Sequence, residues 1–162
     1  MKLHVLALQL HEYNPKRFYC LESRKNLVIQ GMFTKLIYTE DVFTINEILF
    51  VIPIQYTYLD YPQESDYYTV YFDQSQVQNA SVMEKLNKLE TEILCSYAMF
   101  MNCRKQSSRT IVSRLSQGFF KVRKTEKHGV DSPRKHFLLK VSGIWEGSTH
   151  YGLTTKIVES II

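Results

Sequence analysis

The C-terminal third of this 162-residue chain combines positive charge with aromatic side chains. Residues 101–162 carry 12 Lys and Arg against 4 Asp and Glu, whereas residues 1–100 carry 8 against 12. Single-stranded nucleic acid is bound by cations that contact its phosphates and by aromatic rings that stack on its bases. The pattern therefore predicts a nucleic-acid-binding surface that includes Arg104, Lys105, Arg109, Arg114, Phe119, Lys121, Arg123, Lys124, Lys127, Arg134, Lys135, Lys140 and Trp145.

A second segment is acidic and rich in tyrosine. Residues 36–83 contain no Lys or Arg at all, while Asp60, Glu64, Asp66 and Asp73 lie among the tyrosines. Tyrosine is favoured at protein interfaces, so this segment would suit a basic protein partner. The predicted interface residues are Tyr58, Tyr61, Tyr67 and Tyr68. The alternative is that these tyrosines cover an edge of the hydrophobic core.

Residue patterns that indicate catalysis are sparse. Glu146 and His150 flank one predicted turn, but no nucleophile motif accompanies them, and a solvated hairpin tip is the simpler interpretation. The sequence has no glycine-rich phosphate loop, no Cys-x-x-Cys and no His-x-x-x-His. We therefore expect a protein that is not an enzyme and that binds no metal or other cofactor.

Length, cysteine usage and hydropathy bound the remaining possibilities. A chain of this size is expected to form one domain, residues 1–162. Its three cysteines are widely spaced and odd in number, which argues against a disulfide framework and favours a reducing compartment. The longest apolar run, Ile48 to Ile54, is far shorter than the ~20 residues of a membrane-spanning helix, so no membrane partner is expected.

Two helices are predicted between the acidic and basic parts of the chain. Ser81 and Glu84 match a capping box, and the apolar residues that follow recur at helical spacing. This pattern predicts one long amphipathic helix over about residues 82–101. A short helix is predicted over about residues 110–117, ending at Gly118.

The chain is predicted to close with β-strands. Residues 119–124 alternate, with Phe120 and Val122 facing inward. Residues 135–158 read as a β-hairpin that carries the only tryptophan, Trp145, on the same face as Phe137. Trp145 is interpreted either as a core or half-core aromatic or as a stacking platform. Glycines within these strands often mark a bulge or a close backbone approach, which is expected of Gly143 and Gly152.

Together these elements predict an α+β fold with antiparallel sheet, one long helix, one short helix and a C-terminal hairpin. Two segments resemble blocks of small uncharacterised β-rich proteins of large eukaryotic DNA viruses. The first consists of residues 33–38 with residues 42–48, and the second of residues 139–146 followed by residues 151–154. The resemblance implies a viral accessory or virion protein and transfers no functional residue. It also implies a host cytoplasmic or nuclear location, or a place in the virion.

Two functions are consistent with these observations. The first is a non-enzymatic viral accessory protein that binds single-stranded nucleic acid through its basic, aromatic-containing C-terminal third. The second is a structural subunit, such as a minor capsid or virion assembly protein. In that case the acidic segment of one copy contacts the basic third of another virion protein or of a second copy, as in a homo-oligomer.

Overall fold

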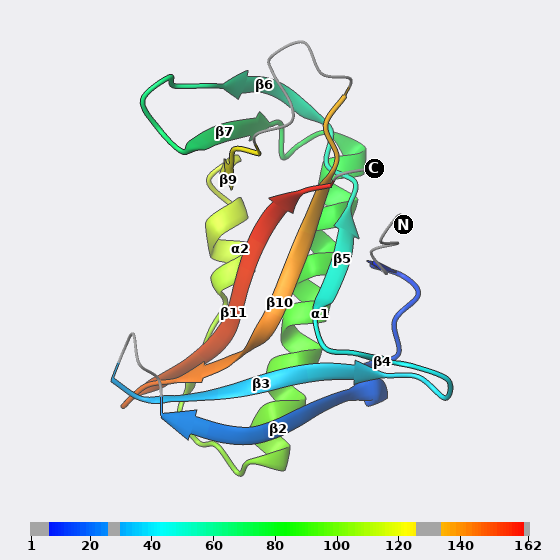
Figure 1. The fold of residues 1–162 in the computed structure, drawn as a ribbon, viewed down its shortest axis with the longest axis vertical. Coiled ribbons are helices and arrows are strands. Elements are labelled where there is room, and N and C mark those ends of the chain that lie inside the picture. Colours follow the sequence, from blue (N-terminus) through cyan, green and yellow to red (C-terminus); the bar gives the residue numbers. More distant parts are fainter. Residues whose placement is uncertain (1–6, 26–29, 126–133, 161–162) are drawn as a thin grey trace.

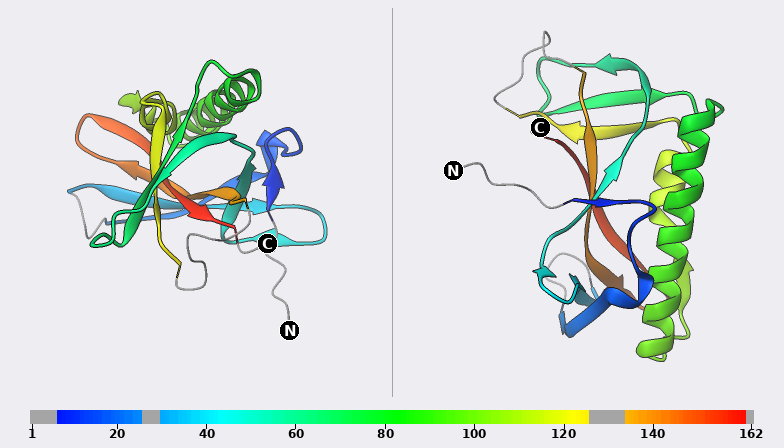
Figure 2. Two further views of the ribbon diagram at one scale, coloured as in Figure 1. Left: turned by 90° about the horizontal axis from the view of Figure 1, so that it is seen from above. Right: turned by 90° about the vertical axis from the view of Figure 1, so that its right-hand side faces the viewer.

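The computed structural model describes residues 7–25, 30–125 and 134–160 of the chain. It has the predicted α+β class, with strands in two sheets and one long and one short helix (Figure 1). The smaller sheet lies at one end of an elongated molecule, the larger sheet extends from there to the other end, and the long helix runs along one side of both, as Figure 2 shows. Lys127 and most of the predicted basic loop lie outside the described residues.

The larger sheet is built around the C-terminal hairpin. Its strands follow the order β1-β5-β10-β11-β8. Strand β3 pairs with the C-terminal end of β10, and β2 and β4 both pair with β3. A 3-10 turn, η1 (Pro15–Arg17), precedes β2. The strand bounds are β1 (Leu8–Gln9), β2 (Phe18–Lys25), β3 (Met32–Thr39), β4 (Thr44–Ile45), β5 (Ile48–Ile52), β8 (Gln106–Ser108), β10 (Phe137–Glu146) and β11 (His150–Glu159).

The smaller sheet joins the acidic segment to the basic one. Its strands are β6 (Tyr56–Asp60), β7 (Tyr67–Phe72) and β9 (Phe119–Arg123), in the order β6-β7-β9 and antiparallel throughout. As predicted, Phe120 and Val122 of β9 face inward and are buried. The pairing of β7 with β9 brings residues some fifty positions apart in sequence side by side.

Helix α1 (Val77–Phe100) begins five residues before the predicted start at residue 82. The predicted capping box at Ser81 and Glu84 is wrong, because the N-cap is Gln76, whose side chain accepts a hydrogen bond from the Asn79 amide. The buried Asn79 side chain in turn donates to the carbonyls of Gln55 and Asp73. The helix start is therefore set by tertiary contacts with the chain entering β6, which no local pattern reports.

Helix α2 (Thr110–Leu115) agrees with the predicted short helix and ends two residues earlier than expected. Its own N-cap side chain makes no capping bond; instead the carboxylate of Glu90 on α1 accepts from the Ile111 amide at 2.9 Å. Glu90 is fully buried, and this burial raises the pKa of its carboxyl group. One helix therefore caps the other in the interior of the protein.

The C-terminal hairpin is confirmed, but its faces differ from simple alternation. The pairing of β10 with β11 shifts between Val141 and Gly143, which is the β-bulge expected near Gly143. The bulge reverses the alternation, so that Ile144 joins Val141 in the core. The prediction that Trp145 shares the face of Phe137 is wrong for this reason.

One hydrophobic cluster runs through the described residues. It includes α1 residues such as Leu86 and Leu89, hairpin residues such as Leu139, and the inner face of the smaller sheet. The two sheets are therefore held by a common core. Among the described residues, no helix has the length and hydropathy that crossing a membrane requires.

Candidate nucleic-acid interface

The outer face of the smaller sheet presents a row of aromatic rings. Strand pairing places Tyr58 of β6 opposite Tyr71 of β7, and Tyr71 opposite Phe119 of β9. The ring centroids of Tyr58 and Tyr71 are 5.8 Å apart, and those of Tyr71 and Phe119 are 5.7 Å apart. Tyr58 and Tyr71 are exposed and Phe119 is half-buried, so this row faces solvent.

Cations continue the same face along β9. Lys121 and Arg123 alternate with the buried Phe120 and Val122, and both cationic side chains are exposed. Lys121 lies opposite Thr69, and Arg123 lies opposite Tyr67. Neither forms an ion pair with a carboxylate of the described residues. Two exposed cations, neither paired with a carboxylate of residues 7–25, 30–125 or 134–160, therefore border the aromatic row.

A bulge in β6 determines that Tyr58 belongs to this row. The pairing of β6 with β7 shifts between Tyr56 and Tyr58, and the hydroxyl of Thr57 donates to the Tyr71 carbonyl at 3.2 Å. Tyr56 consequently lies opposite the buried Phe72 and packs against Phe137, with ring centroids 6.0 Å apart. Without this bulge Tyr56 and Tyr58 would face the same side, because alternate residues of a strand share a face.

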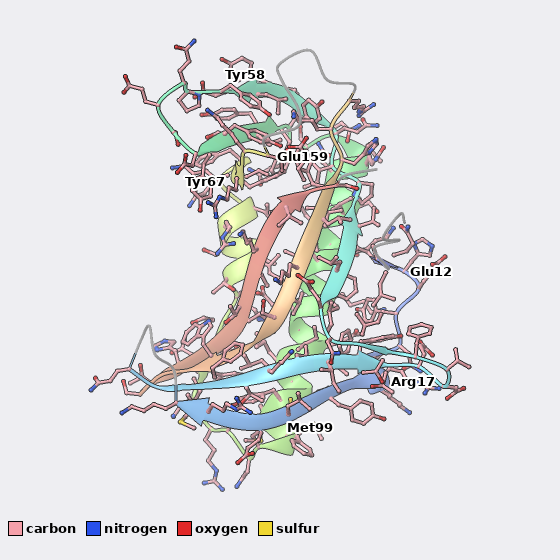
Figure 3. The ribbon with its side chains drawn as sticks, in the orientation of Figure 1. Glu12, Arg17, Tyr58, Tyr67, Met99 and Glu159 are labelled. Atoms are coloured by element: carbon pink, nitrogen blue, oxygen red, sulfur yellow. The ribbon has the colours of Figure 1, made fainter. Side chains whose placement is uncertain are left out.

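Directly beneath the sheet lies a buried ion pair. The ammonium of Lys135 donates to Glu159 at 2.9 Å, and the hydroxyl of Tyr68 donates to the other Glu159 oxygen at 2.8 Å. The ring of Tyr61 stacks on that of Tyr68 at 4.4 Å, and the Lys135 ammonium lies 5.3 Å from the Tyr61 centroid. Figure 3 labels Glu159 near the end of β11 that lies closest to the strands carrying Tyr58 and Tyr67.

The protonation of this cluster follows from its surroundings. Burial, and then the hydrogen bond to Glu159, raise the pKa of Tyr68 well above its usual value. For Lys135, burial opposes the charged form, but its contacts with Tyr61 and Glu159 outweigh burial and raise the pKa. The phenol and the ammonium are therefore both held protonated at neutral pH.

Two predicted surface residues belong to this buried cluster instead. Tyr68 is 0% exposed and Lys135 is 8% exposed, so neither is available to a partner, and their assignment to binding surfaces is wrong. Tyr61 is half-buried, and Lys124 lies over its ring at 5.6 Å and donates to the Pro62 carbonyl. Tyr68 is buried because of strand parity, since it alternates along β7 with the exposed Tyr67.

Several of the remaining predicted cations contact other parts of the fold. Arg109 bonds to Asn87 and Thr91 of α1, and Lys140 pairs with Glu47 at 2.7 Å. Lys105 pairs with Glu146 at 3.6 Å near the turn of the hairpin, at the end of β10 away from the smaller sheet. Arg104 adjoins Lys105, Arg114 is exposed on α2, and Arg134 is exposed just before β10.

This distribution corrects the expectation of a single basic surface. Three of the predicted cations, Lys105, Lys135 and Lys140, are paired with local carboxylates. The acidic and basic segments also meet inside one sheet, because β7 pairs with β9. Charge that is separated along the sequence is therefore mixed in the fold.

Trp145 is half-buried and packs within its own sheet. A Cβ atom at Gly152 would lie 2.8 Å from the Trp145 ring, so the ring covers the backbone of the opposite strand. This is the close backbone approach that glycine allows and that was expected at Gly152. The half-core interpretation of Trp145 accounts for its position.

The pair Glu146 and His150 does not meet. Glu146 accepts from the Cys103 thiol at 3.1 Å and from the Tyr97 hydroxyl at 3.5 Å, whereas the His150 ring bonds to the Thr149 hydroxyl. Burial raises the pKa of the Cys103 thiol, which disfavours the nucleophilic thiolate. Among the residues that the structure describes, no group of His, Cys, Asp and Glu is arranged to hold a metal ion.

Sequence reasoning missed one residue of the outer face, Tyr71. It lies four residues after Tyr67 on β7, and residues an even number apart share a face of a strand. The same parity separates Tyr67 from Tyr68, so recognising the strand was enough to predict that Tyr71 shares the face of Tyr67.

Comparisons with known proteins add no functional assignment. No protein-family model matches the chain, and no curated protein or solved structure is significantly similar to it.

Proposed function

We propose that this protein binds single-stranded nucleic acid on the outer face of the β6-β7-β9 sheet. The observation that carries the proposal is the solvent-facing row of Tyr58, Tyr71 and Phe119 beside Lys121 and Arg123, two cations that pair with no carboxylate in the described part of the chain. An open β-sheet with exposed aromatic residues is a common platform for stacking unpaired bases. The accessory role in a virus, which rests on two short resembling segments, is part of this proposal.

The arrangement matches what an unpaired strand offers. Bases have apolar faces that stack on aromatic rings whatever their sequence, and phosphates follow the bases at regular intervals. On this sheet the rings lie in one row across the strands, and the cations lie further along β9. A single strand of nucleic acid that crosses β7 can thus place its bases on Tyr71 and Phe119. Its phosphates then lie near Lys121 and Arg123.

The test is a fluorescence-anisotropy titration of a labelled oligothymidine at low salt. Changing Tyr71 to Ala and, separately, Phe119 to Ala removes a stacking surface, and each is expected to weaken binding by ~1–3 kcal/mol. The double variant Lys121→Glu, Arg123→Glu should weaken binding further and lower its salt dependence. A titration that stays flat at low salt would exclude the proposal.

A matched control separates the platform from net charge alone. Arg24 and Lys25 are exposed on β2, in the larger sheet, and Figure 1 shows β2 at the opposite end of the molecule from β6 and β7. The variant Arg24→Glu, Lys25→Glu has the same net charge as the β9 variant. Equal losses of affinity in the two variants would indicate general attraction rather than a site on the sheet.

Contact with another protein through the same face is the second candidate, as in a structural subunit of a virion. It is favoured by the exposure of Tyr58 and Tyr67, because tyrosine is enriched at interfaces. The intramolecular pairing of β7 with β9 already joins the acidic and basic segments, so a second copy is not needed for that contact. A concentration-dependent rise in mass that Tyr58→Ala abolishes, without oligonucleotide binding, would favour this candidate.

A further inference from the structure

A concave site lies at the other end of the molecule from the β6-β7-β9 sheet. A pocket of about 560 Å³ opens between η1, the start of β2, and the C-terminal half of α1. Its volume lies within the ~300–1,000 Å³ that is usual for small-molecule sites. Figure 3 shows Met99, from the wall formed by α1, at the opposite end of the molecule from Tyr58 and Tyr67.

The pocket walls are held in place by hydrogen bonds outside the pocket itself. The Tyr13 hydroxyl donates to Glu92 of α1 at 2.7 Å, which ties the chain before η1 to the helix. The Asn14 amide donates to the hydroxyl of the buried Tyr38 on β3 at 3.0 Å, and the Asn14 side chain caps η1. The opening is therefore preformed rather than a gap between loosely packed segments.

The lining of the pocket is apolar, and its floor and rim differ. Leu36 and Ile93 form a buried floor. At the rim, Met99 is 84% exposed and Phe100 is 75% exposed, an unusual exposure for two adjacent large apolar residues of a helix. An apolar ligand that lies in the pocket would cover both side chains.

The charge on the described lining of the pocket is positive. Among the described residues, Lys16 is the only charged one that lines it, and no described Asp or Glu does. Nearby carboxylates are already paired, since Glu92 accepts from Tyr13 and lies near Lys88, while Glu40 and Asp41 pair with Arg17. Lys16 forms no ion pair within the described residues, which leaves its ammonium available to an anion.

We propose that this pocket binds a long-chain carboxylic acid, with the acyl chain against Leu36, Ile93 and Met99 and the carboxylate at Lys16. An apolar cavity with a single cation at its edge is complementary to an apolar chain with a single anionic head. The site is separate from the outer face of the β6-β7-β9 sheet and does not depend on the function proposed for it.

The test is isothermal titration calorimetry of the full chain with dodecanoate below its micellar concentration. We expect one molecule of dodecanoate per chain. Ser96 is exposed and lines the pocket, so Ser96→Trp fills the cavity from a position that tolerates a larger side chain, and it should abolish binding. Lys16→Gln should weaken dodecanoate binding about fivefold, the size of effect that a partly exposed ion pair contributes.

Dodecanol, which has the same chain without the carboxylate, separates charge from apolar contact. It should bind more weakly than dodecanoate, and Lys16→Gln should leave its affinity unchanged. The control variant Lys25→Gln removes a cation from β2 outside the pocket and should change neither ligand's affinity. Circular dichroism of each variant verifies folding.

Three results would overturn the proposal. The first is the absence of dodecanoate binding to the folded wild-type chain. The second is unchanged binding to a folded Ser96→Trp variant, which would place the ligand elsewhere. The third is equal affinity for dodecanol and dodecanoate, which would assign the pocket to an uncharged apolar group, such as a side chain of a protein partner. Oligonucleotide affinity is measured in parallel, so failure of one site is distinguishable from failure of the other.

Discussion

The two faces of the β6-β7-β9 sheet use the same residue types for opposite purposes. Tyr67 and Tyr68 are adjacent in sequence, yet Tyr67 is 44% exposed and Tyr68 is 0% exposed. On the outer face, tyrosines form an open row, whereas on the inner face Tyr68 stacks on Tyr61 and bonds to Glu159. Residue type therefore did not separate the exposed tyrosines from the buried one; strand parity did.

The cations show the same division. Lys121 on the outer face is exposed and unpaired within the described residues, while Lys135 on the inner side is buried against Glu159 and two tyrosine rings. A buried charge must be compensated locally, but an exposed one is free to meet a partner. The inner face should therefore respond to mutation in stability, and the outer face in binding.

The largest effect is expected from Glu159→Ala. This change leaves the Lys135 ammonium and the Tyr68 hydroxyl buried without their shared acceptor. Removing one partner of a buried ion pair typically costs ~3–5 kcal/mol. Urea denaturation at neutral pH measures the loss in the free energy of unfolding.

A double replacement shows whether that loss comes from the unpaired charge. Lys135→Met with Glu159→Leu removes both charges and keeps similar volumes, so stability should recover substantially compared with Glu159→Ala. If the double variant is as unstable as Glu159→Ala, then packing around this pair, rather than its charge, sets the cost.

The second largest effect is expected from the hydroxyl of Tyr68. Tyr68→Phe removes its bond to Glu159 and should lower the free energy of unfolding by about 1–2 kcal/mol. Tyr67→Phe is the matched change on the outer face and should alter stability by less than ~0.5 kcal/mol. Similar losses in the two variants would contradict the division between the faces.

Alkaline pH should lower the stability of the folded protein through Tyr68 on the inner face. The pKa of Tyr68 is raised in the folded protein by burial and by Glu159, while an unfolded tyrosine titrates near pH ~10. Below pH ~10 the contribution of protonated Tyr68 to the free energy of unfolding is fully present. Above it the unfolded chain releases a proton that the folded protein retains, so stability falls as pH rises.

Thermal or urea unfolding at about pH 8 and about pH 11 measures this effect, bracketing the ordinary tyrosine pKa. Tyr68→Phe should lose less stability between these values than the wild type does. Other tyrosines with raised pKa values, such as Tyr13 and Tyr38, are unchanged in the variant and contribute equally to both proteins. An identical pH dependence would mean that Tyr68 is not the group that titrates.

The smallest effect on stability is expected from Lys121→Gln. The side chain is exposed and forms no ion pair with any residue that the structure describes, so the free energy of unfolding should change by less than ~0.5 kcal/mol. If Lys121 contacts a phosphate, the slope of log affinity against log salt should fall by about 0.7, the value for one contact with a single strand. A stability loss as large as that of Glu159→Ala would place Lys121 in a structural role.

Local patterns were enough to predict the elements that have a regular period. The repeat of apolar residues in α1, the alternation of β9 and the two long strands around Gly147 each reflect one buried face of a single element. The fold class, the short helix α2 and the bulge near Gly143 followed from the same local rules.

Tertiary contacts decided the features that involve distant parts of the chain. Helix α1 begins at Val77 because Gln76 and Asn79 bond to the segment entering β6, and α2 is capped by Glu90 from another helix. The pairing of β7 with β9 mixed the two charge blocks, and it brought Tyr71 next to Phe119. Strand parity shows which tyrosines share a face of β7, but strand pairing across long sequence separations decides which face is exposed to solvent and which lysine meets a buried carboxylate.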